Sequence, residues 1–448
     1  MIRKFELKDH EKDSMLFGSR LKTALVLVLI LFCALASRFY YLQIFRNDYF
    51  SGRSDLNRLH TQYVPPSRGL IFDRNAVLLA DNKPSFSLTI TTELATDIEG
   101  SFELLNSILG IGESELTRFW ERRARRNIPH SSVPLRFELT GEELAIFAVN
   151  QHRLPGFNIE AQFIRNYPLG GIAPHAIGYV SEIDKDELEG FIEAQAVNYG
   201  GSHKIGKTGI EKTYEEILHG QVGFEVVEKN NLGRIMRVLD RTEPIADQNI
   251  VLYLDSNLQA VAEKALGDYR GAVVAIDPQT GGVLAMISKP DFDPNIFVSG
   301  ASRSELAQMR NAAYSPEFNR ALSSRVPGST IKPFMSLAGL YYELVTPEHV
   351  ISDRGFYQST YRRRPYYDWT WWADKSGHGE INLERAIYQS CNTYFYELAD
   401  LLGIDRVEEY LATVGFGRNN SIDIPEAGVG ILASRAWKLE NRGEPWYL

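Results

Sequence analysis

The sequence predicts a multi-domain protein of the α/β (α+β) class that a single N-terminal transmembrane helix holds in a membrane. The chain has 448 residues, enough for two or three domains at about 100–200 residues each. Hydrophobic residues make up 44% and charged residues 23%, which is ordinary for folded globular domains. Segments typical of strands alternate with segments typical of helices, and one long apolar stretch lies near the N-terminus.

The net charge is −9, from 48 basic and 57 acidic residues. We expect no nucleic-acid partner, because proteins that follow a phosphate backbone normally carry an excess of basic residues. One local cluster of arginines departs from this balance: Arg118, Arg122, Arg123, Arg125 and Arg126. The cluster has two interpretations, contact with an anionic lipid headgroup or a partner, and the solvated face of a surface helix.

The apolar stretch from Thr23 to Phe45 contains 23 residues, and roughly 20 are enough to cross a hydrocarbon core. Six basic residues precede it, so the positive-inside rule predicts that residues 1–22 are a cytoplasmic tail. Everything after about residue 46 then faces the periplasm from the inner (plasma) membrane of a bacterium. A signal peptide cut after Ala36 and lipid attachment at Cys33 are competing interpretations. With only two cysteines, a disulfide framework is excluded.

Residues 46–245 are predicted to form a first outward domain of mixed helix and strand, which we call the pedestal. Apolar runs between turn residues indicate strands, and apolar residues at helical spacing indicate helices. The expected elements are strands within 59–92, helices over 101–127 and 140–150, and loops and strands over 155–250.

The character of the chain changes after Pro244, which places a domain boundary near residue 245 and makes 246–448 a second domain. The expected elements are a short strand over 250–254, a helix over 257–266 and two strands over 271–276 and 283–287. A Pro and Gly turn joins the last two runs, which predicts a hairpin within an antiparallel sheet.

Ser329 and Lys332 form an S-x-x-K motif at the start of a helix that we expect to be buried. Pro333 is tolerated only in a first helical turn, so both residues fall in that turn and on one face. A serine hydroxyl becomes a good nucleophile when a base takes its proton, and a desolvated lysine has a lowered pKa suited to that task. The motif therefore indicates nucleophilic catalysis, in which the Ser329 amide can help to hold an oxyanion.

A second polar group follows 61 residues later, at Ser390-Cys391-Asn392. It comes directly after an expected helix over 382–389, which places it in a loop. There Ser390 can pass a proton and Asn392 can hold a peptide carbonyl. An S-x-N tripeptide alone is weak evidence, and it gains weight from the S-x-x-K motif before it.

These motifs resemble those of the class B penicillin-binding proteins, and among them the elongation-type penicillin-binding protein 2 group. Besides the anchor, the resemblance is carried by Arg68-Gly-Leu-Ile-Phe-Asp-Arg-Asn75, Gly206-Lys-Thr-Gly-Ile-Glu211, Pro327-Gly-Ser-Thr-Ile-Lys332 and Ser390-Cys-Asn-Thr-Tyr394. It implies that the pedestal is a dimerisation-type domain. It also implies that the second domain is a penicillin-recognising serine transpeptidase domain, an antiparallel sheet with helices.

The resemblance implies a peptidoglycan D,D-transpeptidase that cross-links stem peptides during cell-wall elongation. Ser329 would attack the penultimate carbonyl of a stem ending in D-Ala-D-Ala, release D-alanine and pass the acyl group to the amine of a neighbouring stem. β-Lactams would acylate the same serine, and Lys332, Ser390 and Asn392 would complete the catalytic set without a cofactor. A SEDS-type glycosyltransferase and elongation scaffold proteins are the implied partners.

Two departures from the family pattern affect this expectation. Ala76 stands where the family has glycine, which concerns only a turn. The third family motif, K-T-G or K-S-G, does not follow Asn392, and we interpret the earlier Lys375-Ser376-Gly377 as a loop. We therefore expect the chain to be C-terminally incomplete and to react poorly or not at all with penicillin.

Two other functions compete with the transpeptidase. One is a non-catalytic, membrane-anchored scaffold of the cell-wall elongation complex, in which acylation is absent. The other is a serine β-lactamase or β-lactam sensor, which shares Ser329 and Lys332 but has no need of the pedestal motif at Arg68 to Asn75.

Asp353, Asp368, His378 and Cys391 supply ligand types that zinc prefers, separated by 15, 10 and 13 residues beside the expected catalytic loop. A closed tetrahedral site built from them would pin that loop. The competing interpretation is a free buried cysteine beside a loop histidine and solvated carboxylates. A structural zinc is thus an open expectation.

Overall fold

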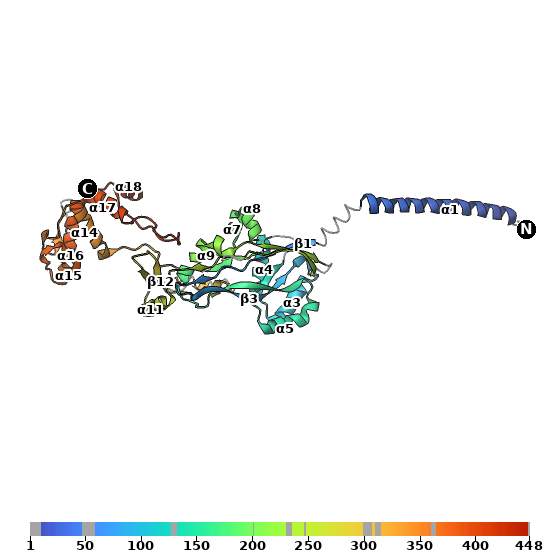
Figure 1. The fold of residues 1–448 in the computed structure, drawn as a ribbon, viewed down its shortest axis with the longest axis horizontal. Coiled ribbons are helices and arrows are strands. Elements are labelled where there is room, and N and C mark those ends of the chain that lie inside the picture. Colours follow the sequence, from blue (N-terminus) through green and yellow to red (C-terminus); the bar gives the residue numbers. More distant parts are fainter. Residues whose placement is uncertain are drawn as a thin grey trace, which may run out of the picture.

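A computed structural model describes residues 10–46, 59–126, 132–199, 201–229, 235–245, 248–298, 307–309, 315–359 and 364–446. The described parts form an elongated molecule (Figure 1). The N-terminal helix stands at one end, the pedestal lies in the middle, and the helices that carry the two serine motifs lie at the other end.

The N-terminal helix α1 (His10–Tyr40) continues into a π-helical turn, η1 (Tyr41–Phe45). Among the described residues, Arg20–Phe45 is the one helical stretch that is long and apolar enough to cross a membrane. Its large apolar side chains, such as Leu25 and Phe32, are exposed, as in a helix that lipid surrounds. The expected apolar helix over 23–45 is therefore present.

The pedestal contains β1 (Leu59–Val64), β2 (Ile71–Phe72), β3 (Leu78–Ile90), η2 (Thr92–Leu94), α3 (Ile98–Leu109), α4 (Glu113–Arg126), β4 (Val133–Arg136), α5 (Gly141–Asn150), η3 (Gln151–Arg153), β5 (Phe157–Asn166), α6 (Pro174–Ile177), β6 (Val180–Glu182), α7 (Lys185–Gly190), α8 (Glu193–Asn198), β7 (Lys204–Gly206), α9 (Gly209–Thr213), α10 (Glu215–His219), β8 (Gly223–Lys229) and β9 (Ile235–Thr242). Its main sheet has the order β10-β2-β3-β4, where β10 is Ile250–Val251, and β5 also pairs with β3. A second sheet has the order β1-β8-β9.

The single helix predicted over 101–127 is wrong, because the structure has two helices, α3 and α4. The first ends where Gly110 adopts the left-handed conformation with a φ of 62°. Phe102 in α3 and Phe119 in α4 enter the same buried core, so the apolar spacing runs on across the break. The predicted helix over 140–150 is present as α5, which begins with a capping box of Thr140 and Glu143.

The arginine cluster of α4 is engaged within the pedestal where the structure describes its side chains. Arg122 lies 2.7 Å from Glu182, and Arg123 lies 2.6 Å from Glu93. These guanidinium groups are therefore used in ion pairs of the pedestal itself, which favours the structural interpretation over a lipid or partner contact. The side chains of Arg125 and Arg126 lie outside the described atoms.

The two pedestal motifs meet in a buried ion network. Arg68 contacts Glu211 at 2.7 Å and Glu215 at 2.6 Å, and Arg165 of β5 contacts Glu211 at 2.6 Å. Burial raises the pKa of Glu211, but Arg165 and Arg68 outweigh it and hold that pKa below its ordinary value. Two positive and two negative groups neutralise one another, which is what allows them to be buried.

The turn of the first pedestal motif is closed by Asp73. Its Oδ1 accepts hydrogen bonds from the backbone amides of Asn75 and Val77 at 2.7 and 2.8 Å. Between them Ala76 has a φ of 62°, a region that glycine enters without strain and alanine does not. The departure from the family's glycine therefore falls at a position whose backbone favours glycine.

The second half of the chain contains β10, α11 (Ser256–Leu266), β11 (Gly271–Ile276), β12 (Val283–Lys289), α12 (Asn295–Val298), η4 (Gly328–Ile331), α14 (Lys332–Tyr341), β13 (Val350–Asp353), β14 (Phe356–Tyr357), β15 (Tyr366–Tyr367), α15 (Trp369–Asp374), β16 (Gly379–Asn382), α16 (Leu383–Tyr388), α17 (Asn392–Thr413) and α18 (Arg435–Arg442). The predicted hairpin is present as antiparallel β11 and β12. The helices expected over 257–266 and 382–389 are present as α11 and α16.

The two halves are joined by more than the chain. The short strand β10, after the predicted boundary near residue 245, pairs in parallel with β2 of the pedestal. The side-chain amide of Asn295 holds Tyr167 of the pedestal through both its backbone N–H and its C=O, at 2.9 and 3.0 Å. The ring of Phe297 stacks on that of Tyr179 at 3.8 Å. The boundary itself stays a prediction.

Candidate active site

The S-x-x-K motif straddles the start of α14. Ser329 is exposed in the 3₁₀ turn η4, and Lys332 is the first residue of α14, with Pro333 in the first turn where its missing N–H costs nothing. Gly328 takes a φ of 57°, which turns the chain into the helix. The prediction of a buried helix is only half right, because Met335 and Ala338 are buried while Leu337 and Tyr341 are exposed.

The structure brings the four predicted catalytic residues together. Lys332 Nζ donates hydrogen bonds to the Ser390 carbonyl at 2.7 Å, to Ser390 Oγ at 3.1 Å and to Asn392 Oδ1 at 2.7 Å. Ser390 Oγ in turn donates to Ser329 Oγ at 2.9 Å. A continuous hydrogen-bonded path thus connects the Ser329 hydroxyl to the Lys332 amine through Ser390.

Lys332 lies in an environment suited to a base. The side chain is buried between α14 and α17, with its Nζ 5.5 Å from the centre of the Phe395 ring. Burial lowers the pKa of Lys332 below its ordinary value, although the charge of Asp368 opposes this. A larger share of Lys332 is therefore neutral near neutral pH than of an exposed lysine.

Ser390 sits in a constrained backbone position at the end of α16. Its φ is 55°, in the region where a helix commonly ends on glycine. The amides of Ser390 and Cys391 donate to the carbonyls of Ile387 and Ala386, which fixes this ending. The indole Nε1 of Trp369 donates to the Gln389 carbonyl at 3.2 Å, a contact that motif reasoning missed.

Asn392 begins α17 and is placed by Asp368. The Asp368 Oδ2 atom accepts hydrogen bonds from the backbone amides of Asn392 and Thr393, which are free donors at a helix N-terminus. Asp368 thus positions the catalytic loop whatever else it binds. The sequence predicts Asp368 only as a metal ligand, and the structure adds this capping role.

The four predicted metal ligands also come together. One possible ligand atom from each of Asp353, Asp368, His378 and Cys391 lies within 4.8 Å of the other three. His378 Nδ1 lies 2.7 Å from Asp353 and 3.8 Å from Asp368, and the Cys391 thiol lies 3.5 Å from Asp353. All four side chains are buried or nearly so.

The chemistry of this cluster fits a divalent zinc ion. Both carboxylates have fully buried side chains, and among the described residues His378 is the one basic group within ion-pair distance of them. Burial, with the two carboxylates, raises the pKa of the Cys391 thiol to about 12. A bound cation relieves both effects, because it neutralises the carboxylates and favours the thiolate.

The Lys375-Ser376-Gly377 triplet lies in the turn between α15 and β16. Lys375 has a φ of 64°, and the backbone of Gly377 packs against that of Asp353. The structure therefore places this triplet in a turn and not on a sheet edge, in line with its interpretation as a loop.

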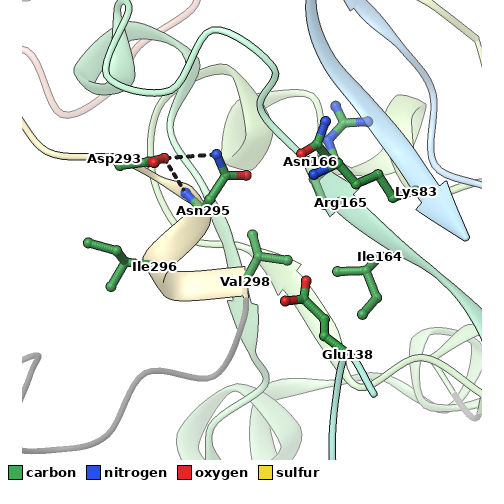
Figure 2. A pocket seen from close by; sticks show the side chains of 9 residues that line it. All are labelled: Lys83, Glu138, Ile164, Arg165, Asn166, Asp293, Asn295, Ile296 and Val298. Atoms are coloured by element: carbon green, nitrogen blue, oxygen red, sulfur yellow. Dashed lines mark hydrogen bonds between the residues drawn. The ribbon is translucent and has the colours of Figure 1, made fainter. Parts of the chain in front are cut away.

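A cavity of about 270 Å³ lies elsewhere, where α12 meets the strands of the pedestal (Figure 2). Its lining includes Lys83, Glu138 and Asp293, and Asp293 accepts hydrogen bonds from Asn295. None of the predicted catalytic or metal-binding residues lines it. It belongs to the junction of the two halves and not to the candidate active site.

Two family models match the chain. One, described as the penicillin-binding protein dimerisation domain, matches residues 63–252, and the other, the penicillin binding protein transpeptidase domain, matches residues 271–443. The peptidoglycan D,D-transpeptidase MrdA of Escherichia coli is 37% identical over 442 residues, which cover 98% of this chain and 69% of that protein. The chain belongs to the penicillin-binding protein 2 family of peptidoglycan D,D-transpeptidases.

Other relatives agree with this family. MrdA of Acinetobacter baumannii is 39% identical over 449 residues, covering 100% of this chain and 65% of that protein. A structure of Pseudomonas aeruginosa PBP2 in complex with WCK 5153 matches with a TM-score of 0.63 and 36% identity, covering 87% of this chain and 64% of that one. A structure of Helicobacter pylori PBP2 in complex with MreC matches with a TM-score of 0.73 and 27% identity. The match covers 87% of this chain and 71% of that one. The chain thus spans about two thirds of these family members.

Proposed function

We propose that the chain carries the acylating centre of a peptidoglycan D,D-transpeptidase, with Ser329 as the nucleophile. The observation that carries this proposal is the hydrogen-bonded path from Ser329 Oγ through Ser390 Oγ to Lys332 Nζ, at 2.9 and 3.1 Å. Membership of the penicillin-binding protein 2 family supports the substrate, a stem peptide ending in D-Ala-D-Ala.

In the proposed step, Ser329 Oγ bonds to the penultimate carbonyl carbon as its proton passes to Ser390, and Ser390 passes its own proton to neutral Lys332. Hydrogen bonds to the resulting oxyanion lower the barrier, and the Ser329 amide is one proposed donor. The C–N bond then breaks, and Lys332 returns the proton to the departing D-alanine. The amine of a neighbouring stem later attacks the acyl-enzyme carbonyl and gives a proton to Lys332. As the ester bond breaks, that proton returns through Ser390 to Ser329 Oγ, while Asn392 holds the stem backbone.

Fluorescent penicillin tests this proposal, because the β-lactam ring opens on the same serine. We expect labelling of the 448-residue chain that Ser329→Ala abolishes. The 448 residues contain no K-T-G or K-S-G after Asn392, and that motif supplies an oxyanion donor in the family. We therefore expect the labelling rate of this chain to be lower by roughly 10²–10³-fold than with that donor present. A chain that never labels, or that labels equally without Ser329, contradicts the proposal.

The same experiment separates the transpeptidase from a second candidate function, a non-catalytic scaffold anchored in the inner membrane with its N-terminus in the cytoplasm. This candidate is favoured by the H. pylori relative, whose structure is a complex with MreC. The partners we propose in either case are an elongation scaffold protein and a SEDS-type glycosyltransferase. The scaffold predicts binding of such partners without any labelling.

We also propose that Asp353, Asp368, His378 and Cys391 hold a structural zinc ion. When bound, zinc would supply a fixed positive centre that ties together β13, the start of α15, the turn before β16 and the start of α17. The residues themselves keep the loop in place: Asp368 caps α17, and the His378 amide and ring both bind Asp353. Catalysis requires no cofactor in this proposal.

A further inference from the structure

Three of the six tryptophans in the chain fall within four residues, at Trp369, Trp371 and Trp372 of α15. Two of them are left in solvent, since Trp369 is 51% and Trp372 69% exposed. Clusters of large, exposed aromatic side chains are typical of binding surfaces. We call Trp369 and Trp372 the tryptophan shelf.

The tryptophan shelf is continuous with the candidate active site. Its two residues are three positions apart on a helix, so they share one face. The Trp369 indole Nε1 donates to the carbonyl of Gln389, the residue directly before Ser390. Anything that lies on the shelf therefore lies beside the loop that contacts Ser329.

The shelf is held in place by the side chains behind it. The Trp372 ring lies T-shaped to that of Tyr367 at 5.3 Å between ring centres, and the Trp369 ring lies T-shaped to that of His378 at 5.6 Å. The Lys375 ammonium lies 5.4 Å from the Trp371 ring centre and 5.3 Å from that of Trp372. Such preorganised aromatic faces bind a ligand with little loss of conformational entropy.

We propose that the tryptophan shelf binds the glycan strand of peptidoglycan, the polymer of acylated amino sugars that carries the stem peptides. A pyranose ring has a flat face of C–H bonds that packs on an indole, while its hydroxyls stay in water. The inference rests on the proposed function, because a stem peptide in the Ser329 site is covalently attached to a glycan that must lie within reach.

The surface fits a saccharide better than a protein or a free peptide. An added peptide strand needs the unpaired backbone groups of a sheet edge, and α15 is a helix that offers none. A stable protein interface buries roughly 1,200–2,000 Å² in total, far more than two indoles provide. The Lys375 ammonium adds a positive charge at the rim, complementary to the free carboxylates of the stem peptides that the glycan strand carries.

The experiment uses the full chain in detergent micelles and a fluorescently labelled, peptide-free glycan strand, with binding followed by anisotropy. We expect Trp372→Ala to weaken binding by about tenfold or more, the loss typical of one aromatic anchor. Trp372→Tyr keeps an aromatic face and should keep most of the affinity. Tyr269→Ala, which removes an exposed aromatic side chain away from α15, is the matched control and should bind as the wild type does.

The graded series guards against misfolding, because Trp372→Ala and Trp372→Tyr should unfold at the same temperature as the wild type. Ser329→Ala must also bind the strand normally, since it removes only the acylation step. If penicillin labelling fails while Trp372-dependent binding holds, the proposed function falls and the tryptophan shelf stands. Wild-type chain that does not bind the strand, equal binding by Trp372→Ala, or binding of free stem peptide alone overturns the inference.

Discussion

The pedestal and the catalytic half bury charged side chains in different ways. In the pedestal, Arg68 and Arg165 neutralise Glu211 and Glu215 through contacts of 2.6–2.7 Å. Beside the catalytic loop, the carboxylates of Asp353 and Asp368 face one histidine and a thiol. A closed, neutral network stabilises one arrangement, whereas an excess of buried negative charge indicates a position prepared for a cation.

The two regions also differ in what their strained backbone positions do. Ala76 in the pedestal and Ser390 in the catalytic half both have positive φ, at 62° and 55°. Ala76 contributes only a turn, so its strain has no function to offset it. The strain at Ser390 places a hydroxyl and a carbonyl against Lys332, which is why a side chain stands where glycine would be easier.

The largest effect is expected at Lys332. Lys332→Ala removes the group that accepts the proton and should lower the rate of penicillin labelling by roughly 10²–10⁴-fold. Because burial lowers the pKa of Lys332, labelling of the wild type should rise with pH as the amine loses its proton and level off below the ordinary lysine range. Labelling rates measured across pH test both statements. A rate that is flat with pH, or unchanged in the variant, would show that another group is the base.

The pedestal network is tested by Glu211→Gln, which removes the negative charge that Arg68 and Arg165 share. We expect the free energy of unfolding to fall by roughly 3–5 kcal/mol in a denaturant titration. The exposed pair of Asp405 and Arg435 is the matched control, and Asp405→Asn should cost less than about 1 kcal/mol. Equal effects of the two substitutions would mean that burial does not matter here.

The same variant has a pH signature. The folded-state pKa of Glu211 is lowered, so its contribution to stability is present above the unfolded-state pKa and is lost as pH falls through the folded value. The stability gap between wild type and Glu211→Gln should therefore narrow in acid. A gap that stays constant from neutral to acid pH would argue that Glu211 is not ionised in the fold.

The zinc proposal is tested by metal analysis and thermal unfolding. Wild-type chain should hold about one zinc ion, and chelation should lower its stability by about 4 kcal/mol if free zinc is otherwise near 1,000 times its dissociation constant. Cys391→Ser should lose the metal, whereas Cys33→Ser, the matched control in α1, should keep it. A chain with neither bound zinc nor any response to chelator would return the cluster to its alternative interpretation as a buried cysteine, a loop histidine and carboxylates.

The smallest effect is expected at the pedestal turn. Ala76→Gly relieves the positive φ and should raise the free energy of unfolding by about 0.5–1 kcal/mol. Penicillin labelling should not change, because the turn touches none of the site residues. If Ala76→Gly instead lowers stability, the entropy that glycine adds to the unfolded chain outweighs the strain that it removes from the fold.

Much of the molecule follows from local sequence patterns. The apolar anchor, α5, α11, the β11 and β12 hairpin and α16 all lie where the pattern of apolar and turn residues predicts them. The failure over 101–127 has a local cause, because α3 and α4 bury their faces in one core and leave a continuous apolar period across Gly110. The predicted burial of α14 was too high, because the helix has few polar residues to indicate which face meets solvent.

Motif order along the chain specifies the residue types of the site: Ser329, Lys332, Ser390 and Asn392, with four possible zinc ligands around them. How these residues meet depends on tertiary packing. Ser390, and not a direct contact, connects Ser329 to Lys332; Asp368 caps α17; and Trp369 reaches the loop before Ser390. The reason is physical, because spacing along a chain specifies contacts within one helix or turn, whereas contacts between residues 58 to 61 positions apart depend on how α14, α16 and α17 pack.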